Sequence, residues 1–382
     1  MVKTSKGRYR VLVILALGVF ALLWTFGCAP AAPPTPTPAA ATPAPAATLA
    51  ATKPVAAATP VPATATPKPV TVKYGSVQNT SEAPTFLAME KGYFQEQGIT
   101  MELTLIQTLS DQIPVLARGD LDIGQGGWAA SISNAAARGL PVKVIGDAGS
   151  LVPGFNPLAI TVRKDLYDEG KVRTAADLKG KKVAVSSPQS MSRYLAPVLA
   201  DAKLTTKDVD LVSLALPDTL AAYANKSIDA AVQIEPLLSQ AVDQGLAVRW
   251  KNVSDYRPGF QSGVLLPSPK LLENKDLANR WFVAYVKGIR AYLDAVNTGQ
   301  GIDEVIAALI KYTSVKDRAA YETMVKQKSM FGFNPNGYAN KESLAFDQEH
   351  WLAEGYVQEK VNITSIVDDS LADYAVQKLG KK

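Results

Sequence analysis

The chain has 382 residues, of which 47% are hydrophobic, which is enough to form a core divided over more than one lobe. The formal net charge is +5, but residues 1–70 hold six Lys or Arg and no Asp or Glu, so the rest of the chain carries 34 basic and 35 acidic side chains. A nucleic-acid binder needs a basic patch on its folded domain. Because no dense Lys or Arg run follows residue 70, nucleic acid is excluded as the expected partner.

Residues 1–27 have the pattern of a secretory signal peptide. The first ten residues are basic, an almost wholly apolar run covers residues 11–26, and the small residue Gly27 follows. The run has 16 residues, and a membrane-spanning helix needs roughly 20. We therefore expect cleavage and export, with an uncleaved membrane anchor as the alternative.

Cys28 is the only cysteine of the chain and directly follows the apolar run. Its position resembles the lipobox of bacterial lipoproteins, in which such a cysteine is lipidated and becomes the mature N-terminus. The resemblance is imperfect because Thr25 stands where the lipobox prefers an aliphatic residue. We expect lipidation at Cys28. The alternative is a soluble exported protein with an incidental cysteine.

Residues 28–69 are interpreted as a tether rich in Pro, Ala and Thr. Residues 29–70 hold 12 of the 25 prolines and show no apolar periodicity, so this stretch cannot bury a core. Extended polyproline rises about 3.1 Å per residue, so roughly 40 residues reach on the order of 100 Å. Such a stretch would hold a folded domain away from a membrane.

The folded part is predicted to begin near residue 70 and to alternate strands with helices. Residues 70–74 read as a strand, residues 83–97 as an amphipathic helix ended by Gly98, and residues 100–106 as a second strand. Similar alternation continues along the chain. This order predicts an α/β fold with mainly parallel sheets.

Two segments repeat the same layout 107 residues apart. Residues 103–127 and residues 210–234 both read as strand, helix, short turn, Asp and strand, and Asp122 in the first corresponds to Asp229 in the second. A period of this length is too long for a solenoid. The repeat therefore predicts two similar α/β lobes.

Two joints rich in Pro and Gly, at residues 154–157 and 255–259, separate the repeated units. We interpret them as two hinge strands that lead into and out of an inserted lobe. Lobe 1 would then comprise residues 70–156 and 259–382, and lobe 2 residues 157–258. Two tandem domains without interleaving are the alternative.

The chain after residue 270 is predicted to be mostly helical. The expected helices cover residues 275–298, 302–313, 315–328, 341–354 and 368–379.

Several phrases of the chain resemble a known family. "VKYGSVQNTSEAPTFLAMEKGYFQEQGI", "RGDLDIGQGGWAASISNAAARGLPVKVIG", "TAADLKGKKVAVSSPQSMSRYLAPVLADAKL" and "DAAVQIEP" are similar to the periplasmic-type binding proteins for nitrate, sulfonate and taurine, whose relatives include binders of thiamine-pyrimidine precursors. The resemblance covers roughly residues 71–290. It implies the two-lobe periplasmic-binding-protein fold of type II, which closes on a small ligand. It also implies delivery to the permease of an ABC importer, at the outer face of the cytoplasmic membrane, by a monomer.

Ligands of open α/β sheets bind beyond the carboxyl ends of the strands, near helix N-termini that favour anions. Polar turns between a strand and a helix are therefore the candidate ligand-binding positions, although Ser, Thr and Asn there can also simply be N-caps. The candidates are Gln78, Asn79, Thr80 and Ser81; Gly126, Gly127 and Trp128; Ser187, Gln189, Ser190 and Met191; the turn Pro217-Asp218-Thr219; Asn156 at the first joint; and Glu235 at a strand end.

Some of these residues have a second interpretation. Gly126 and Gly127 allow a ligand to approach the backbone, but no Lys-Ser/Thr follows them, so they are not a nucleotide-binding loop. Trp128 could stack on a ligand or fill the core, and Glu235 could bind an amine, contact the hinge or pair with a lysine. Arg193 and Arg257 could each clamp an anion or lie in solvent.

Catalytic and metal sites are not expected. His350 is the only histidine and Cys28 the only cysteine, so zinc sites and Cys-His or Ser-His-Asp triads are excluded or disfavoured. We predict a binding protein without a cofactor, for a sulfonate, nitrate or a similar small anion or zwitterion. Trp128, Phe155 and Tyr256 keep a flat heteroaromatic ligand, such as a pyrimidine precursor, as an alternative. An enzyme on the same scaffold and a sensory domain are the less favoured readings.

Overall fold

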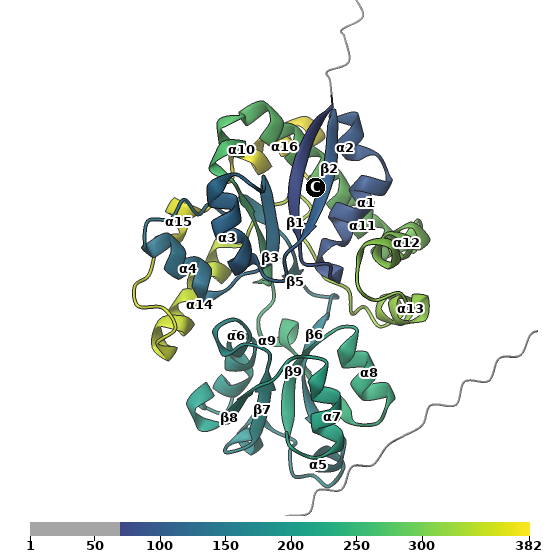
Figure 1. Cartoon of the computed structure of the whole chain (residues 1–382). Coiled ribbons are helices and arrows are strands. Elements are labelled where there is room, and N and C mark those ends of the chain that lie inside the picture. The colour runs from purple at the N-terminus through teal and green to yellow at the C-terminus, as the bar shows by residue number, and fades with distance from the viewer. Residues whose placement is uncertain (1–68) are drawn as a thin grey trace, which may run out of the picture. The chain divides into compact units, whose positions relative to one another are not determined.

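The structure is a computed structural model that describes residues 69–382, so the predicted leader, Cys28 and nearly all of the tether lie outside the described residues. Residues 69–382 form two lobes, each built around a five-stranded sheet (Figure 1). No helix in this part of the chain is long and apolar enough to cross a membrane. The prediction of a two-lobe α/β fold is confirmed, but the expectation of mainly parallel sheets is wrong, because each sheet also contains antiparallel strand pairs.

The first lobe contains a mixed sheet with the strand order β2-β1-β3-β12-β4. Strand β1 pairs in parallel with β2 and β3, and β12 pairs antiparallel with β3 and β4. The carboxyl ends of β1, β2 and β3 therefore lie at one edge of the sheet. The strands are β1 (Val70–Ser76), β2 (Ile99–Leu105), β3 (Ile123–Gly127), β4 (Gly146–Asp147) and β12 (Gly263–Pro267).

The second lobe contains a sheet with the order β10-β6-β9-β7-β8. Strand β7 is parallel to β8 and β9, whereas β6 runs antiparallel to its neighbours β9 and β10. The strands are β6 (Leu158–Arg163), β7 (Lys182–Val185), β8 (Asp210–Ser213), β9 (Ala230–Ile234) and β10 (Ala247–Asn252).

The internal repeat is visible in the hydrogen bonds of its two aspartates. The carboxylate of Asp122, just before β3, accepts from the backbone N–H of Lys73 in β1 at 2.8 Å. The carboxylate of Asp229, just before β9, accepts from the backbone N–H of Lys182 in β7 at 3.0 Å. Each aspartate thus links the start of its own strand to the neighbouring parallel strand, and the same hydrogen bond occurs in both lobes.

The helices of the first lobe include most of the C-terminal part of the chain, which surrounds the first sheet in Figure 1. They are α1 (Ala83–Glu90), α2 (Tyr93–Glu96), α3 (Leu109–Arg118), α4 (Ala130–Ala137), α10 (Pro269–Glu273), α11 (Lys275–Thr298), α12 (Ile302–Tyr312), α13 (Arg318–Lys326), α14 (Lys341–Glu354), α15 (Ile363–Ile366) and α16 (Ser370–Leu379). The second lobe has α5 (Lys164–Asp168), α6 (Pro188–Ala200), α7 (Asp218–Ala224), α8 (Leu237–Asp243) and α9 (Val253–Tyr256).

One predicted helix was too long. The expected helix over residues 83–97 is broken into α1 and α2, because Gly92 between them has a φ of 74°. A left-handed residue of this kind ends one helix and redirects the chain before the next begins.

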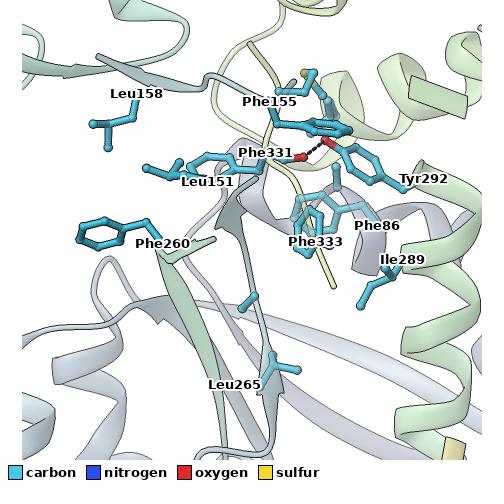
Figure 2. Packing of buried hydrophobic residues seen from close by; sticks show 14 of the residues in the cluster. Phe86, Leu151, Phe155, Leu158, Phe260, Leu265, Ile289, Tyr292, Phe331 and Phe333 are labelled. Atoms are coloured by element: carbon cyan, nitrogen blue, oxygen red, sulfur yellow. Dashed lines mark hydrogen bonds between the residues drawn. The ribbon is translucent and has the colours of Figure 1, made fainter. Parts of the chain in front are cut away.

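The chain passes between the lobes at a two-stranded antiparallel pair, β5 (Ser150–Leu151) and β11 (Phe260–Gln261). Figure 2 shows the apolar packing there, in which Leu151, Phe155 and Phe260 lie near Phe331. All four side chains are buried, and the Tyr292 hydroxyl donates to the Phe331 carbonyl at 2.6 Å. Both segments that connect the lobes therefore pack against this buried apolar cluster.

Candidate functional site

A polar cleft of 680 Å³ lies where strand ends of the first lobe face the N-terminus of α6 in the second lobe. None of its lining side chains is charged. The lining residues are Val77, Asn79, Gln107, Thr108, Leu109, Ser110, Gly127, Ala129, Ala130, Ser131, Asn134, Ser187, Gln189, Ser190, Gly355 and Tyr356.

The turn after β1 places Asn79 at the cleft, and hydrogen bonds to the Glu82 carboxylate hold this turn in place. Asn79 caps a short 3₁₀ helix (Thr80–Glu82), and its Oδ1 accepts from the backbone N–H of Ser81 at 2.9 Å. The carboxylate of Glu82 accepts from the Asn79 N–H at 3.2 Å and from the Ser76 hydroxyl at 3.1 Å. Burial raises the pKa of Glu82 to about 7, although these hydrogen bonds oppose the shift.

The turn after β2 also reaches the cleft, and a buried glutamine fixes it against β3. The side-chain amide of Gln112 donates to the carbonyls of Ile106 and Gln125 at 3.1 and 3.2 Å. A Cβ at Gly75 or Gly124 would lie within 2.5 Å of the Gln112 side chain. These glycines therefore make room for the polar side chain that aligns two strand ends.

The two glycines at the end of β3 have different roles. A Cβ at Gly126 would lie 2.9 Å from the Leu109 Cβ, so Gly126 allows α3 to pack closely, in place of the predicted approach to a ligand. A Cβ at Gly127 would meet nothing nearer than the Ser262 carbonyl at 4.0 Å, and this glycine lines the cleft. Trp128, an expected ligand contact or core residue, is fully buried with its ring 5.8 Å from that of Trp351.

Helices α4 and α6 both begin at the cleft without a side-chain cap. The predicted residues Ser187, Gln189 and Ser190 all line the cleft at the start of α6. The first N–H groups of a helix have no partner within the helix and carry a partial positive charge. At the start of α6, however, Pro188 has no N–H and the Ser190 N–H donates to the Ser187 carbonyl at 3.2 Å. The first turn of α4 and the Gln189 N–H of α6 are therefore the backbone donors that the two lobes can present to this space.

The other predicted positions lie outside this cleft. Asn156 and Glu235 meet at the base of the second lobe, where the guanidinium of Arg249 donates to the Asn156 carbonyl and pairs with the Glu235 carboxylate. Glu235 thus pairs with an arginine, whereas the interpretation as an ion pair had expected a lysine, and both residues belong to the crossing between the lobes. Those not brought to the cleft lining are Gln78, Thr80, Ser81, Gly126, Trp128, Met191 and the turn Pro217-Asp218-Thr219.

The turn at Thr219 fails as a ligand position for a local reason. Its side chain is buried, accepts from the amide of Gln233 at 2.5 Å and donates to the Leu216 carbonyl at 2.5 Å. Because the single O–H donor of Thr219 is used inside its own lobe and its side chain is buried, this hydroxyl cannot donate to a ligand in the cleft.

Several lining residues were missed by the sequence analysis. Gln107 and Thr108 lie in the polar turn between β2 and α3, and Ser110 lies in the first turn of α3, so the rule applied to the other turns would have found them. Ser131 and Asn134 lie on the first turns of α4, after Gly127. Tyr356, at the end of α14, carries no such signal because only the tertiary fold brings it to the cleft.

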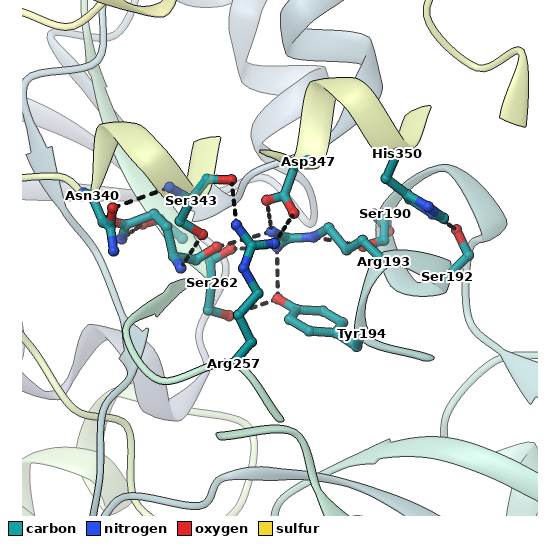
Figure 3. A network of polar contacts seen from close by, with 12 residues as sticks. Ser190, Ser192, Arg193, Tyr194, Arg257, Ser262, Asn340, Ser343, Asp347 and His350 are labelled. Carbon is teal, nitrogen blue, oxygen red and sulfur yellow. Dashed lines mark hydrogen bonds and ion pairs between the residues drawn. The ribbon is translucent and has the colours of Figure 1, made fainter. Parts of the chain in front are cut away.

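Arg193 and Arg257 are neither solvated nor anion clamps in this structure. Arg193 is 1% exposed and pairs with Asp347, and Arg257 lies 3.6 Å from the same carboxylate (Figure 3). Within residues 69–382, no group of three or more His, Cys, Asp or Glu side chains is arranged to hold a metal ion.

Comparisons with known proteins place the chain in a family. A Brucella abortus protein named as a binding protein is 27% identical over 246 residues, covering 63% of this chain and 70% of that protein. A Bacillus subtilis protein named for binding aliphatic sulfonates is 30% identical over 196 residues, covering 50% of this chain and 56% of that protein.

The fold is also found in a solved structure. The periplasmic nitrate-binding protein of Synechocystis PCC 6803 superposes with a TM-score of 0.67 over 82% of this chain and 89% of that protein, at 16% identity. Residues 79–295 match the model of the family described as NMT1/THI5 like. This match spans more than half of the chain, and the chain therefore belongs to the NMT1/THI5-like family.

Proposed function

We propose that this protein is an extracytoplasmic solute-binding protein that captures a small molecule in the 680 Å³ cleft and delivers it to the permease of an ABC importer. The observation that carries the proposal is the convergence of polar turns from both lobes on one space. A ligand bound there would contact both lobes at once, so its binding would favour the closed arrangement. We assign residues 70–156 and 259–382 to one lobe and residues 157–258 to the other, with the protein acting as a monomer and without catalysis.

The lining favours a small anion or zwitterion such as a sulfonate or nitrate. The N-terminus of α4 and the Gln189 N–H of α6 supply backbone donors, and Asn79, Ser187 and Ser190 add amide and hydroxyl groups. Anions bind readily at such helix ends without a formal positive charge nearby. A flat pyrimidine ligand is the second candidate, and Tyr356 is the aromatic side chain of the lining on which it could stack.

The proposal predicts a double dependence of binding on the two lobes. Replacing Ser187 and Ser190 together by Ala should weaken binding about tenfold, because two hydrogen bonds of roughly 0.5–1.5 kcal/mol each are lost. Replacing Asn79 by Ala should weaken binding from the other lobe. A thermal-shift screen of sulfonates, nitrate, bicarbonate and pyrimidines identifies the ligand, and isothermal titration then measures each affinity.

A matched control is Ser227→Ala, which removes an exposed hydroxyl of the second lobe away from the cleft. Its affinity should equal that of the wild type. If the serine pair and Asn79 could both be replaced without any loss of affinity, the ligand would lie elsewhere and the cleft would not be the site.

We also propose that the protein is exported and held at the outer face of the cytoplasmic membrane through a lipid on Cys28. The signal-peptide pattern and the proline-rich tract support this localisation. Replacing Cys28 by Ser should release the protein from the membrane fraction, because the lipid provides the apolar anchor. An unchanged membrane-bound product would instead indicate an uncleaved N-terminal anchor.

A further inference from the structure

Helix α6, whose N-terminus lines the cleft in the second lobe, also contacts helix α14 of the first lobe. The contact centres on Arg193, whose Nη1 lies 2.5 Å from the carboxylate of Asp347, with side-chain exposures of 1% and 0%. Figure 3 shows this pair between the two helices. An ion pair so deeply buried holds its two partners in one geometry, because removing either leaves an uncompensated charge.

The guanidinium of Arg193 also donates to three backbone carbonyls, one in its own helix and two in the segment at residues 261–262. Its Nε donates to the Ser190 carbonyl at 3.0 Å, and its Nη1 and Nη2 donate to the carbonyls of Gln261 and Ser262 at 2.9 and 3.0 Å. Ser190 lines the cleft, whereas Gln261 and Ser262 belong to the segment that returns to the first lobe. The planar guanidinium therefore connects the ligand-binding turn directly to the crossing.

Helix α14 contacts α6 and ends at the cleft. The His350 ring lies 3.0 Å from the Ser192 hydroxyl of α6. Arg257 packs on the ring of Phe346 at 3.5 Å and faces Asp347 at 3.6 Å. The helix ends at Gly355, which lines the cleft together with Tyr356. The contact between α6 and α14 thus sets the position of cleft residues on both sides.

We propose that Arg193 is a positioning residue that, through Asp347, holds the start of α6 (residues 187–190) against the first lobe and so maintains this lobe arrangement around the cleft before a ligand arrives. The inference rests on the proposed function for its meaning in ligand capture, but the lobe arrangement of the free protein tests it independently. If the binding-competent state becomes less populated, the apparent affinity falls by the same fraction.

The test uses Arg193→Met and Arg193→Lys, the latter keeping the charge but losing the planar fork of donors. Spin labels on cysteines introduced at the exposed positions Asp201 and Glu342, in a Cys28→Ser background, report the distance between α6 and α14 by pulsed EPR. We expect longer distances in the ligand-free Arg193→Met protein and an intermediate distribution for Arg193→Lys. We also expect about tenfold weaker binding of methanesulfonate or nitrate, whichever the wild type binds, for Arg193→Met.

The control is Lys207→Met, which removes a solvent-exposed contact between the same two lobes, where the Lys207 ammonium lies 3.4 Å from the Ala353 carbonyl. It should leave both distance and affinity unchanged. Folded Arg193 variants with wild-type spin-label distances would overturn the positioning role. Loss of the circular dichroism signal of the folded protein in both variants would also overturn it, because Arg193 would then be needed for folding itself. Absence of any small-molecule binding by the wild type would instead contradict the proposed function while the distance measurement still stands.

Discussion

Replacing Gly127 by Leu is expected to abolish ligand binding while leaving the protein folded. Gly127 lies at the end of β3 and lines the cleft, and a Cβ there would meet nothing nearer than 4.0 Å. A leucine side chain would therefore extend into the space that a ligand occupies. We expect at least a hundredfold loss of affinity, or about 2.7 kcal/mol, measured by isothermal titration, with little change in the urea midpoint.

The adjacent glycine provides the matched control. At Gly126 a Cβ would lie 2.9 Å from the Cβ and 3.2 Å from the backbone nitrogen of Leu109, so Gly126→Ala should push α3 away from the sheet. Crowding of a packed interior typically costs about 1–3 kcal/mol, so this variant should lose stability. Tight binding by folded Gly127→Leu would show that the ligand does not enter this part of the cleft.

Glu82 is expected to make the protein less stable as the pH rises from about 4.5 to about 7. Burial raises the pKa of Glu82 to about 7 from its ordinary value of 4.5. Between these values the native protein keeps a proton that the unfolded chain has lost, so raising the pH favours unfolding. The stabilisation is complete below pH 4.5 and is lost by about pH 7, and it amounts to about 3 kcal/mol at roughly 1.4 kcal/mol per pKa unit.

Glu82→Gln tests this expectation because glutamine stays neutral and its carbonyl oxygen can still accept from Ser76 and Asn79. Urea unfolding between pH 4.5 and 7.5 should show a flatter dependence for the variant than for the wild type. Burial also raises the pKa of Asp147, to about 6, but this carboxyl is present in both proteins and cancels in the comparison. Parallel pH profiles would mean that Glu82 is ionised in the native protein throughout this range.

The candidate site was predicted best where the sequence marks the end of a strand. Asn79, Gly127, Ser187, Gln189 and Ser190 were predicted and line the cleft, because a polar turn between a parallel strand and a helix lies at the carboxyl edge of its sheet. The prediction of these turns needed only local patterns. Their meeting in one cleft is a property of the structure.

The same local rule could not distinguish the polar turns that line the cleft from those that do not. Thr219 makes its hydroxyl hydrogen bonds inside its own lobe, and Glu235 pairs with Arg249, which lies on another strand 14 positions further along the chain. Trp128 follows a cleft-lining glycine but packs against Trp351, a residue of the C-terminal helices. Each outcome depends on a partner from another element, which no local pattern specifies.

The sequence by itself determined the alternation of strands and helices, the repeated βαβ layout with Asp122 and Asp229 at matching places, and the polar turns at strand ends. These features follow from hydrophobic periodicity, turn chemistry and connection length, all of which act over short stretches of chain. The tertiary structure alone decided that Arg193 meets Asp347 and that Tyr356 reaches the cleft. These contacts join residues more than 150 positions apart, and long-range packing of the lobes, with its desolvation of charge, selects them.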